Sequence, residues 1–417
     1  MKNYIIDNQL LNNDGKSDVI KLFWIGFIIY TIGYFLSITF KVNPYLRAII
    51  QILGLIIFIP AAVKLIQFRI DNFYLKVTFT LYCFWLFHVI TRGFLFEKKF
   101  MQDMIFDPFE GVFLYLVPLI VLFPKSLFFY KKMFGAISLL SIGFIIYSLF
   151  FFKILINNDI SNSYAQTAVE YSSKTLSLSC GFLLLTFIYH SNKRKLLAFF
   201  VIALTLLFSI IRARRGLVFM TIFPLIMSLM LYIFHIRKGK SNLTILFLSM
   251  ITILAVTYFY IIFIKEGNYG MFGSIIGRSG EDTRSEVVQY FFNDMNLKDW
   301  IIGKGINGQY FFPTEDGFYR NGIESDYLNI ILKGGIISLG LQLLILIPAV
   351  FKGLVYSKNM LAKAAGIWIL FYILCLYPSP NTKFTLFYLI VWTSVGICYS
   401  KKIRELSDES LREYFHS

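Results

Sequence analysis

Continuous apolar runs, each long enough to cross a lipid bilayer, recur along the whole chain. A helix needs roughly 20 apolar residues to cross about 30 Å of hydrocarbon, whereas a membrane strand is about half as long and alternates. The runs therefore predict helices. We expect twelve membrane spans, at residues 21–40, 46–66, 73–92, 109–124, 133–155, 175–190, 195–211, 216–235, 243–264, 326–351, 361–378 and 384–400.

The polar connections between these runs differ in charge from one to the next. With the N-terminus inside, each inner connection carries three lysines or arginines, which is typical of cytoplasmic loops. The outer connections carry few, or balance them with acids, as Asp159 and Glu170 do around Lys153 and Lys174. The pattern predicts that both termini are cytoplasmic. The inner sets are Lys64/Arg69/Lys76, Lys125/Lys131/Lys132, Lys193/Arg194/Lys195, Arg237/Lys238/Lys240, Lys352/Lys358/Lys363 and Lys401/Lys402/Arg404.

One outer segment, residues 265–325, is much longer than the other connections and is glycine-rich, aromatic and mildly acidic. Such long connections are usually functional or disordered. Thr283-Arg284-Ser285-Glu286 has the capping-box pattern, so a helix is expected to begin here. It would be amphipathic and lie on the outer membrane surface or close over a cavity. Its apolar face would be formed by Val287, Val288, Phe291, Phe292 and Met295.

These patterns predict an all-α fold, that of a polytopic integral membrane protein with about 12 transmembrane helices and one large periplasmic loop. The chain divides into four parts. About nine spans form an N-terminal bundle over residues 1–264, and the periplasmic loop covers 265–325. About three further spans occupy 326–400, and a cytoplasmic tail covers 401–417.

Composition supports this assignment. Hydrophobic residues make up 57% of the chain and charged residues 15%, against about 25% charged residues in soluble domains. The net charge of +16 occurs in small sets between spans and not along one face, so we expect membrane lipid and no nucleic acid as a partner. All four cysteines lie in apolar runs, and metal-ligand motifs are lacking. The sequence therefore predicts no disulfide framework, no metal and no other cofactor.

Three arginines, Arg212, Arg214 and Arg215, occupy the short connection between the spans at 195–211 and 216–235. Charge bias does not explain them, because this connection is on the expected outer side. An arginine inside the membrane costs roughly 2.5–3.5 kcal/mol on insertion scales, and such residues are usually functional. The cluster predicts a binding site for an anion. Arg212 is also in a position to face lipid headgroups.

Arg284, in the first turn of the predicted amphipathic helix, is a further candidate for the same anion. A helix N-terminus attracts anions, and a guanidinium binds phosphate with two parallel hydrogen bonds. The alternative is a surface ion pair with Glu281 or Glu286.

Two carboxylates, Glu324 and Asp326, mark the re-entry of the chain into the membrane. Either one is placed to act as general base on a hydroxyl group. The alternative is helix capping, since Ser325 or Asp326 would suit an N-cap. We favour Asp326 for capping and Glu324 for chemistry.

Four further residues are candidates for lining a substrate cavity on the outer side: Arg278, His88, Arg92 and Gly305. His88 and Arg92 share a helix face, although a packed histidine and a snorkelling arginine are the alternatives. Gly305 belongs to residues 303–308, the glycine turn, which matches G-x-G-x-x-G but lacks the strand–helix context of a dinucleotide site. The glycine turn would shape the chain under a headgroup or sugar, or would be a plain flexible turn.

The order of these features resembles the bacterial O-antigen polymerase and O-antigen ligase superfamily. The resemblance covers about a third of the chain, from about residue 209 to 343. It consists of an arginine-glycine signature at a span entry, an arginine in a large loop, a glycine turn ending in an aromatic residue, and a last span entry followed by a glycine pair. The matching residues are Arg214-Arg215-Gly216, Arg284, Ile302–Phe311, and Glu324-Ser325-Asp326-Tyr327-Leu328 with Gly334-Gly335-Ile336-Ile337.

This resemblance implies a metal-independent glycosyltransferase of the bacterial inner membrane. It would act at the periplasmic face on polyprenyl-diphosphate-linked oligosaccharides as donor and acceptor, with a chain-length regulator as a further partner. The anion expected at the arginine cluster and at Arg284 would then be the diphosphate of this substrate. Ligases of the superfamily typically have a histidine-asparagine pair where this chain has Glu324-Ser325, so the resemblance favours a polymerase. A surface-glycan ligase and a lipid-linked oligosaccharide flippase or other transporter remain the alternatives.

Overall fold

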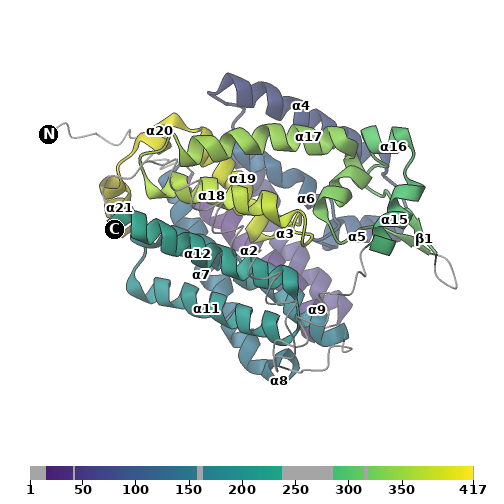
Figure 1. Cartoon of the computed structure of the whole chain (residues 1–417), viewed down its shortest axis with the longest axis horizontal. Helices are drawn as coiled ribbons and strands as arrows, with labels where there is room; N and C mark the ends of the chain where they lie inside the picture. The colour runs from purple at the N-terminus through teal and green to yellow at the C-terminus, as the bar shows by residue number, and fades with distance from the viewer. Residues whose placement is uncertain (1–15, 41–42, 157–162, 237–284, 314–317, 417) are drawn as a thin grey trace.

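Seven helices in the described part of the chain are long and apolar enough to cross a membrane. The structure is a computed structural model that describes residues 16–40, 43–156, 163–236, 285–313 and 318–416 (Figure 1). The helices lie side by side in a bundle. The seven long ones are α2 (Ser17–Phe40), α3 (Pro44–Leu65), α4 (Phe73–Arg92), α7 (Leu127–Phe150), α11 (Asn192–Ile211), α12 (Arg215–Ile236) and α17 (Asp326–Leu354).

Within the ranges just given, the remaining elements are short, and nearly all of them are helical, as predicted. The exception is an antiparallel hairpin of β1 (Tyr310–Phe312) and β2 (Phe318–Arg320). The short helices are α5 (Lys98–Phe106), α6 (Phe113–Leu116), η1 (Val117–Leu122), α8 (Phe152–Leu155), α9 (Ser163–Ser172), η2 (Ser173–Ser177), α10 (Cys180–Leu185), η3 (Phe187–Tyr189), α15 (Ser285–Asp294), α16 (Leu297–Ile302), α18 (Met360–Cys375), α19 (Leu386–Tyr399), α20 (Lys401–Glu405) and α21 (Asp408–His416).

The prediction of twelve spans is not confirmed. The expected span at 109–124 is the short pair α6–η1. The last two expected spans are α18 and α19, and these helices are also shorter than the length needed to cross the hydrocarbon. The expected span at 175–190 is broken into η2, α10 and η3. Its serine and threonine side chains bond back to the helix backbone, as Thr175 Oγ1 does to Tyr171 O, and such bonds bend helices. The span at 243–264 lies outside the described residues.

The short apolar helices are stable because they are buried among other helices of the protein. Every residue of α19 is buried, so α19 packs against other helices along its whole length. A helix surrounded by protein does not have to match the thickness of the hydrocarbon. By contrast, α3 and α4 expose large apolar side chains such as Ile56 and Phe84, which are 63% and 70% exposed. These outer helices present the surface that lipid would cover.

The predicted amphipathic helix is confirmed as α15. Phe291 is fully buried and Met295 is nearly so, whereas Phe292 is half exposed. Phe291 and Met295 form a second apolar core with Tyr310, Ile323 and Leu332, and this core fixes the end of the long loop against α17. The apolar face of α15 therefore packs against protein at the end of α17. The capping residues Thr283 and Arg284 lie outside the described residues.

The glycine turn also packs against α17. Gly335, inside α17, has φ +68°, and this left-handed residue kinks the helix. A kink deprives the preceding carbonyls of their helical partners. The glycine turn supplies new ones, because Lys304 N donates to Leu332 O (2.7 Å) and Gly305 N donates to Lys333 O (2.9 Å). The glycine turn is thus a structural cap on the kinked helix, not a plain flexible turn.

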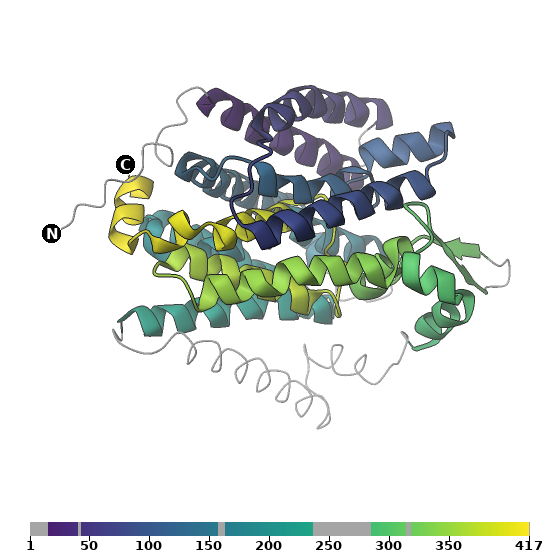
Figure 2. The same ribbon diagram turned by 90° about the horizontal axis from the view of Figure 1, so that it is seen from above.

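Different connections between helices lie at the two ends of the bundle. Helices α20 and α21 lie at one end, and α15, α16 and the hairpin lie at the other, here named the hairpin end (Figures 1 and 2). Connections predicted to be inner meet α20 and α21. Lys358 N donates to Arg404 O (2.9 Å), and the Lys131 ammonium lies 5.7 Å from the centre of the Tyr414 ring. This grouping agrees with the predicted alternation of connections.

We predict that the hairpin end faces the periplasm. A membrane-impermeant thiol reagent applied to intact cells should label a Lys298→Cys variant and spare a Glu409→Cys variant, each in a cysteine-free background. Both positions are exposed, one in α16 and one in α21, so accessibility to the reagent depends only on the side of the membrane. Labelling of Glu409→Cys alone would show that the orientation is the reverse of the predicted one.

Candidate functional site

The arginine connection is a tight turn between α11 and α12. Arg214 N donates to Ser209 O (2.8 Å), and Ala213 has φ +50°, a left-handed conformation that reverses the chain. Arg212 is fully buried, which corrects the expectation that it could face lipid headgroups. It ends α11 and its side chain packs inside the bundle, whereas Arg214 and Arg215 are half-buried.

Arg214 forms an ion pair with Glu170 of α9. Arg214 Nη2 lies 3.0 Å from Glu170 Oε2, and Lys174 Nζ lies 2.7 Å from Glu170 Oε1. Burial by itself would raise the pKa of Glu170, but Lys174 and Arg214 outweigh it and lower this pKa to about 2. Glu170 is therefore charged at neutral pH and neutralises part of the cationic cluster. Within the described residues, the buried Arg214 Nε has no hydrogen-bond partner.

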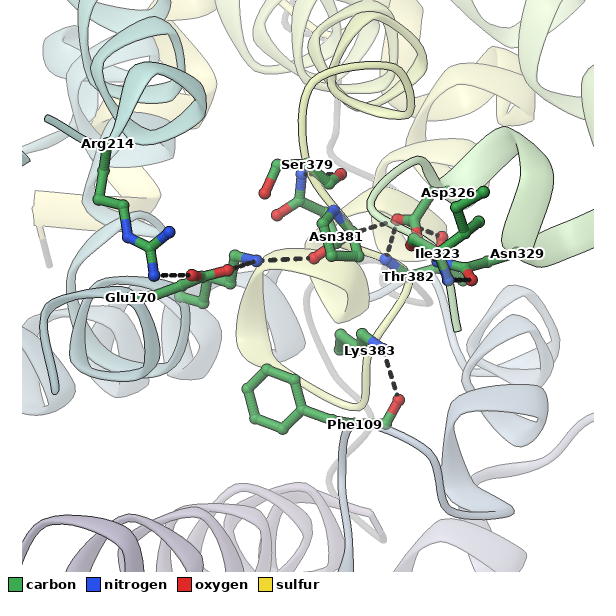
Figure 3. Close-up of polar contacts among 12 residues, drawn as sticks. Phe109, Glu170, Arg214, Ile323, Asp326, Asn329, Ser379, Asn381, Thr382 and Lys383 are labelled. Carbon is green, nitrogen blue, oxygen red and sulfur yellow. Dashed lines mark hydrogen bonds and ion pairs between the residues drawn. The ribbon is translucent and has the colours of Figure 1, made fainter. Parts of the chain in front are cut away.

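The connection between α18 and α19, residues 376–385, lies between this cluster and the start of α17 (Figure 3). We name it the 376–385 loop. Lys174 Nζ donates to Pro380 O (3.0 Å), which fixes the loop on one side. At Gly216 a Cβ atom would lie 3.0 Å from Pro378 O, so the glycine of the Arg-Arg-Gly sequence allows α12 to approach the loop closely.

Asp326 fixes the other side of the 376–385 loop. Its side chain is buried, and Oδ2 accepts hydrogen bonds from Thr382 N (2.6 Å), Thr382 Oγ1 (3.0 Å) and Asn381 N (Figure 3). Asn329 Nδ2 donates to Oδ1 at 3.4 Å. Capping of its own helix, the role favoured from the sequence, is thus not what this carboxylate does. Ser325 is the N-cap residue of α17, but its side chain makes no capping hydrogen bond.

Glu324 differs from Asp326 in its surroundings. It is exposed, whereas Asp326, two residues later, is only 1% exposed. An exposed carboxylate is accessible to an incoming hydroxyl group. The two carboxylates that the sequence placed together are therefore not equivalent.

A cavity of about 80 Å³ opens beside Asp326, and we name it the end cavity. Its walls come from α4, α6 and the two residues 109–110 before it, residues 321–322, α17, the 376–385 loop and α19. Lys333 Nζ donates to Gly308 O (2.8 Å), and Lys383 Nζ donates to Phe109 O (2.9 Å). The polar and aromatic lining residues include Glu110, Asp326, Asn329, Lys333, Gln342, Thr382, Lys383, Tyr82, Tyr115 and Tyr388.

Several predicted residues are not part of this arrangement. His88 is exposed beside the Trp85 ring, so it is neither in the end cavity nor a packed histidine. Arg92 donates to Ile302 O (3.3 Å) and thereby holds α16. Gly305, with φ +85°, belongs to the cap on α17. His88 and Arg92 share a face of α4, but Leu86 and Val89 on another face line the cavity. Arg278 and Arg284 lie outside the described residues.

Four charged residues of the site were missed from the sequence: Glu110, Glu170, Lys174 and Lys383. A signal for Lys383 was present, because it is a lysine in a short connection on the expected outer side. The same reasoning had singled out the arginines. Glu170 and Lys174 were noticed only as balancing charges, since their contacts with Arg214 and the 376–385 loop join segments far apart in the chain.

Comparisons with protein-family models, with curated proteins and with solved structures found no match to this chain. The chemistry of the site itself is therefore the basis for assigning a function. That site has two parts, a cationic cluster of Arg214 and Lys174 around Glu170 and the end cavity with its two lysines. The 376–385 loop connects them.

Proposed function

We propose that this protein is a metal-independent glycosyltransferase that polymerises polyprenyl-diphosphate-linked oligosaccharide repeat units. The product would be an O-antigen, capsule or exopolysaccharide, made at the periplasmic face of the bacterial inner membrane. The proposal joins the sequence resemblance to a site that lies at one end of membrane-length helices, where a lipid-linked substrate can reach it. Its partners would be the lipid-linked oligosaccharide, membrane lipid and a chain-length regulator.

The observation that carries the proposal is the incomplete hydrogen bonding of Arg214. Its buried Nε has no partner within the described residues, although its Nη2 pairs with Glu170. Buried donors are nearly always satisfied in native proteins, so this one calls for an acceptor, and its position beside two other cationic side chains favours an anion. The oxygens of a diphosphate would supply the missing acceptor and would compete with Glu170 for Arg214 and Lys174.

The arrangement suits glycosyl transfer from a diphosphate. The bond from the anomeric carbon of the donor to the diphosphate oxygen breaks, and the acceptor hydroxyl oxygen forms a new bond to that carbon. Arg214, Arg215 and Lys174 would stabilise the negative charge that develops on the leaving diphosphate. A carboxylate takes the hydroxyl proton as the oxocarbenium-like centre forms. We assign this role to Glu324, because the Asp326 carboxylate already accepts four hydrogen bonds.

Reconstitution would test the proposal against its alternatives. The full-length protein in liposomes should convert a synthetic polyprenyl-diphosphate-linked oligosaccharide, supplied as the only glycan, into a ladder of longer lipid-linked chains. A ligase would give no ladder and would transfer the glycan only after a separate acceptor was added. A flippase would move the lipid across the bilayer without extending it, and that result would contradict the proposal.

A Glu324→Gln variant should lose roughly 100-fold or more in polymerisation rate, the usual contribution of a general base. Glutamine keeps the size of the side chain but cannot accept a proton at neutral pH. The measurement is polymer length on a gel at matched membrane levels. Glu286→Gln, an exposed glutamate in the first turn of α15, is the matched control and should polymerise normally. Full-length polymer from Glu324→Gln would show that Glu324 is not the general base. Glu110 would then be the next carboxylate to test.

A further inference from the structure

Two lysines reach the end cavity from different elements, Lys333 from α17 and Lys383 from the 376–385 loop. Each donates a hydrogen bond to one backbone carbonyl, at 2.8 and 2.9 Å. Within the described residues, neither ammonium has a carboxylate oxygen within 4.0 Å. An ammonium has three donors, so both lysines keep donors for a ligand in the cavity. Of the two carboxylates at the same cavity, Asp326 already accepts hydrogen bonds from the 376–385 loop and Glu110 is exposed to solvent, so the two ammonium groups favour an anion.

The other walls suit a sugar ring. Tyr82, Tyr115 and Tyr388 line the cavity with aromatic side chains, and Gln342 lines it with an amide. Small-molecule sites commonly combine largely apolar walls with a few fixed polar groups. Glu110, which is exposed, lies at the same cavity and can accept hydrogen bonds from sugar hydroxyls. The volume of about 80 Å³ is too small for a whole oligosaccharide, so a ligand would place only one of its sugar residues here.

We propose that the end cavity binds the carboxylate of an acidic sugar, a hexuronic acid residue of the repeat unit, between Lys333 and Lys383. This inference rests on the proposed function and specifies its substrate class. The diphosphate belongs elsewhere, because the paired donors of arginine suit phosphate better than separate ammonium groups do, and Arg214 lies on the other side of the 376–385 loop (Figure 3).

Binding of two matched probes tests the assignment. Methyl β-glucuronide and methyl β-glucoside have the same ring and differ at one carbon, which bears a carboxylate in the first and a hydroxymethyl group in the second. Their dissociation constants are measured by ligand-observed NMR with the full-length protein in lipid nanodiscs. We expect the glucuronide to bind roughly tenfold more tightly, as charge-assisted hydrogen bonds would produce.

Lysine variants locate the site. Lys383→Met and Lys333→Met should each remove most of the tenfold preference, and Lys383→Arg, which keeps the charge, should retain it. Lys352→Met changes a lysine near the far end of α17 and is the matched control, expected to bind both probes as the unmodified protein does. Thermal unfolding of each variant shows whether it is folded. If a methionine variant is unstable, the binding preference of Lys383→Arg is compared with that of the unmodified protein instead.

Three outcomes would overturn the inference. They are equal affinity for the two probes, a preference that survives in a folded Lys333→Met/Lys383→Met double variant, and displacement of the glucuronide by inorganic phosphate at lower concentration than by free glucuronate. The last result would assign the cavity to a phosphate group. These binding measurements need no polymerisation, so their failure is distinguishable from failure of the proposed glycosyltransferase activity.

Discussion

Replacing Arg214 and Arg215 together by alanine is expected to reduce polymer formation by roughly 100- to 1000-fold. Removing a fixed donor that stabilises developing charge usually has an effect of this size. Arg214→Lys should fail nearly as badly, because a single ammonium cannot reproduce the two parallel hydrogen bonds of a guanidinium to phosphate. The measurement is the rate of ladder formation by reconstituted protein, with equal amounts of inserted protein.

Two comparisons keep this prediction specific. Arg412→Ala, at an exposed position in α21 at the opposite end of the bundle, should polymerise normally. Glu170→Gln removes the charge that pairs with both Arg214 and Lys174, so it should strengthen binding of a diphosphate such as inorganic pyrophosphate if Glu170 competes with the substrate. If the Arg214→Ala/Arg215→Ala variant is inserted in the membrane and makes normal polymer, these two arginines have no role in the mechanism.

Asp326→Asn is expected to destabilise the protein and to abolish polymer, although asparagine caps helices about as well as aspartate does. In the structure, Asp326 accepts hydrogen bonds from Asn381, Thr382 and Asn329. An amide in its place presents an NH₂ group to one of these donors and loses the charge, at a cost of about 3 kcal/mol. The 376–385 loop would then lose its anchor. The measurements are the unfolding temperature in detergent and polymer length.

Smaller changes at the same anchor separate its parts. Thr382→Val removes one hydroxyl donor to Asp326 and should cost only about 1 kcal/mol, with shorter polymer. Asp18→Asn, at an exposed aspartate in the first turn of α2, should leave both measurements unchanged. An Asp326→Asn variant with an unchanged unfolding temperature but no polymer would show that Asp326 acts in the chemistry and not as an anchor.

Local sequence properties predicted the long helices well. Length and hydropathy identify α2, α3, α4, α7, α11, α12 and α17, because a helix satisfies its backbone hydrogen bonds within one segment. The same local reasoning found α15 from its capping box and apolar face. It failed at 175–190, where η2 interrupts the helix, and at α18 and α19, which are shorter than expected. Hydropathy does not distinguish a helix buried in protein from one surrounded by lipid.

The candidate site was predicted only in part. Unusual charge on the expected outer side identified the arginine turn, and the same argument applied to Lys383 would have added one lysine of the end cavity. The sequence favoured Glu324 over Asp326 for chemistry, but it did not predict that Asp326 would hold another segment of the chain, since both carboxylates stand beside the same span entry. Only the 376–385 loop, which comes more than 50 residues later in the chain, distinguishes them by binding Asp326.

The sequence by itself determined that this is a helical, multi-pass membrane protein with a cationic turn between two of its spans. Those properties follow from hydrophobicity, helical spacing and charge along single segments. Only the tertiary structure decided that Arg214 pairs with Glu170, that Asp326 holds the 376–385 loop, and that Lys333 and Lys383 reach one cavity. These contacts join segments far apart in the chain, and which segments meet depends on how whole helices pack, a property that no single segment carries.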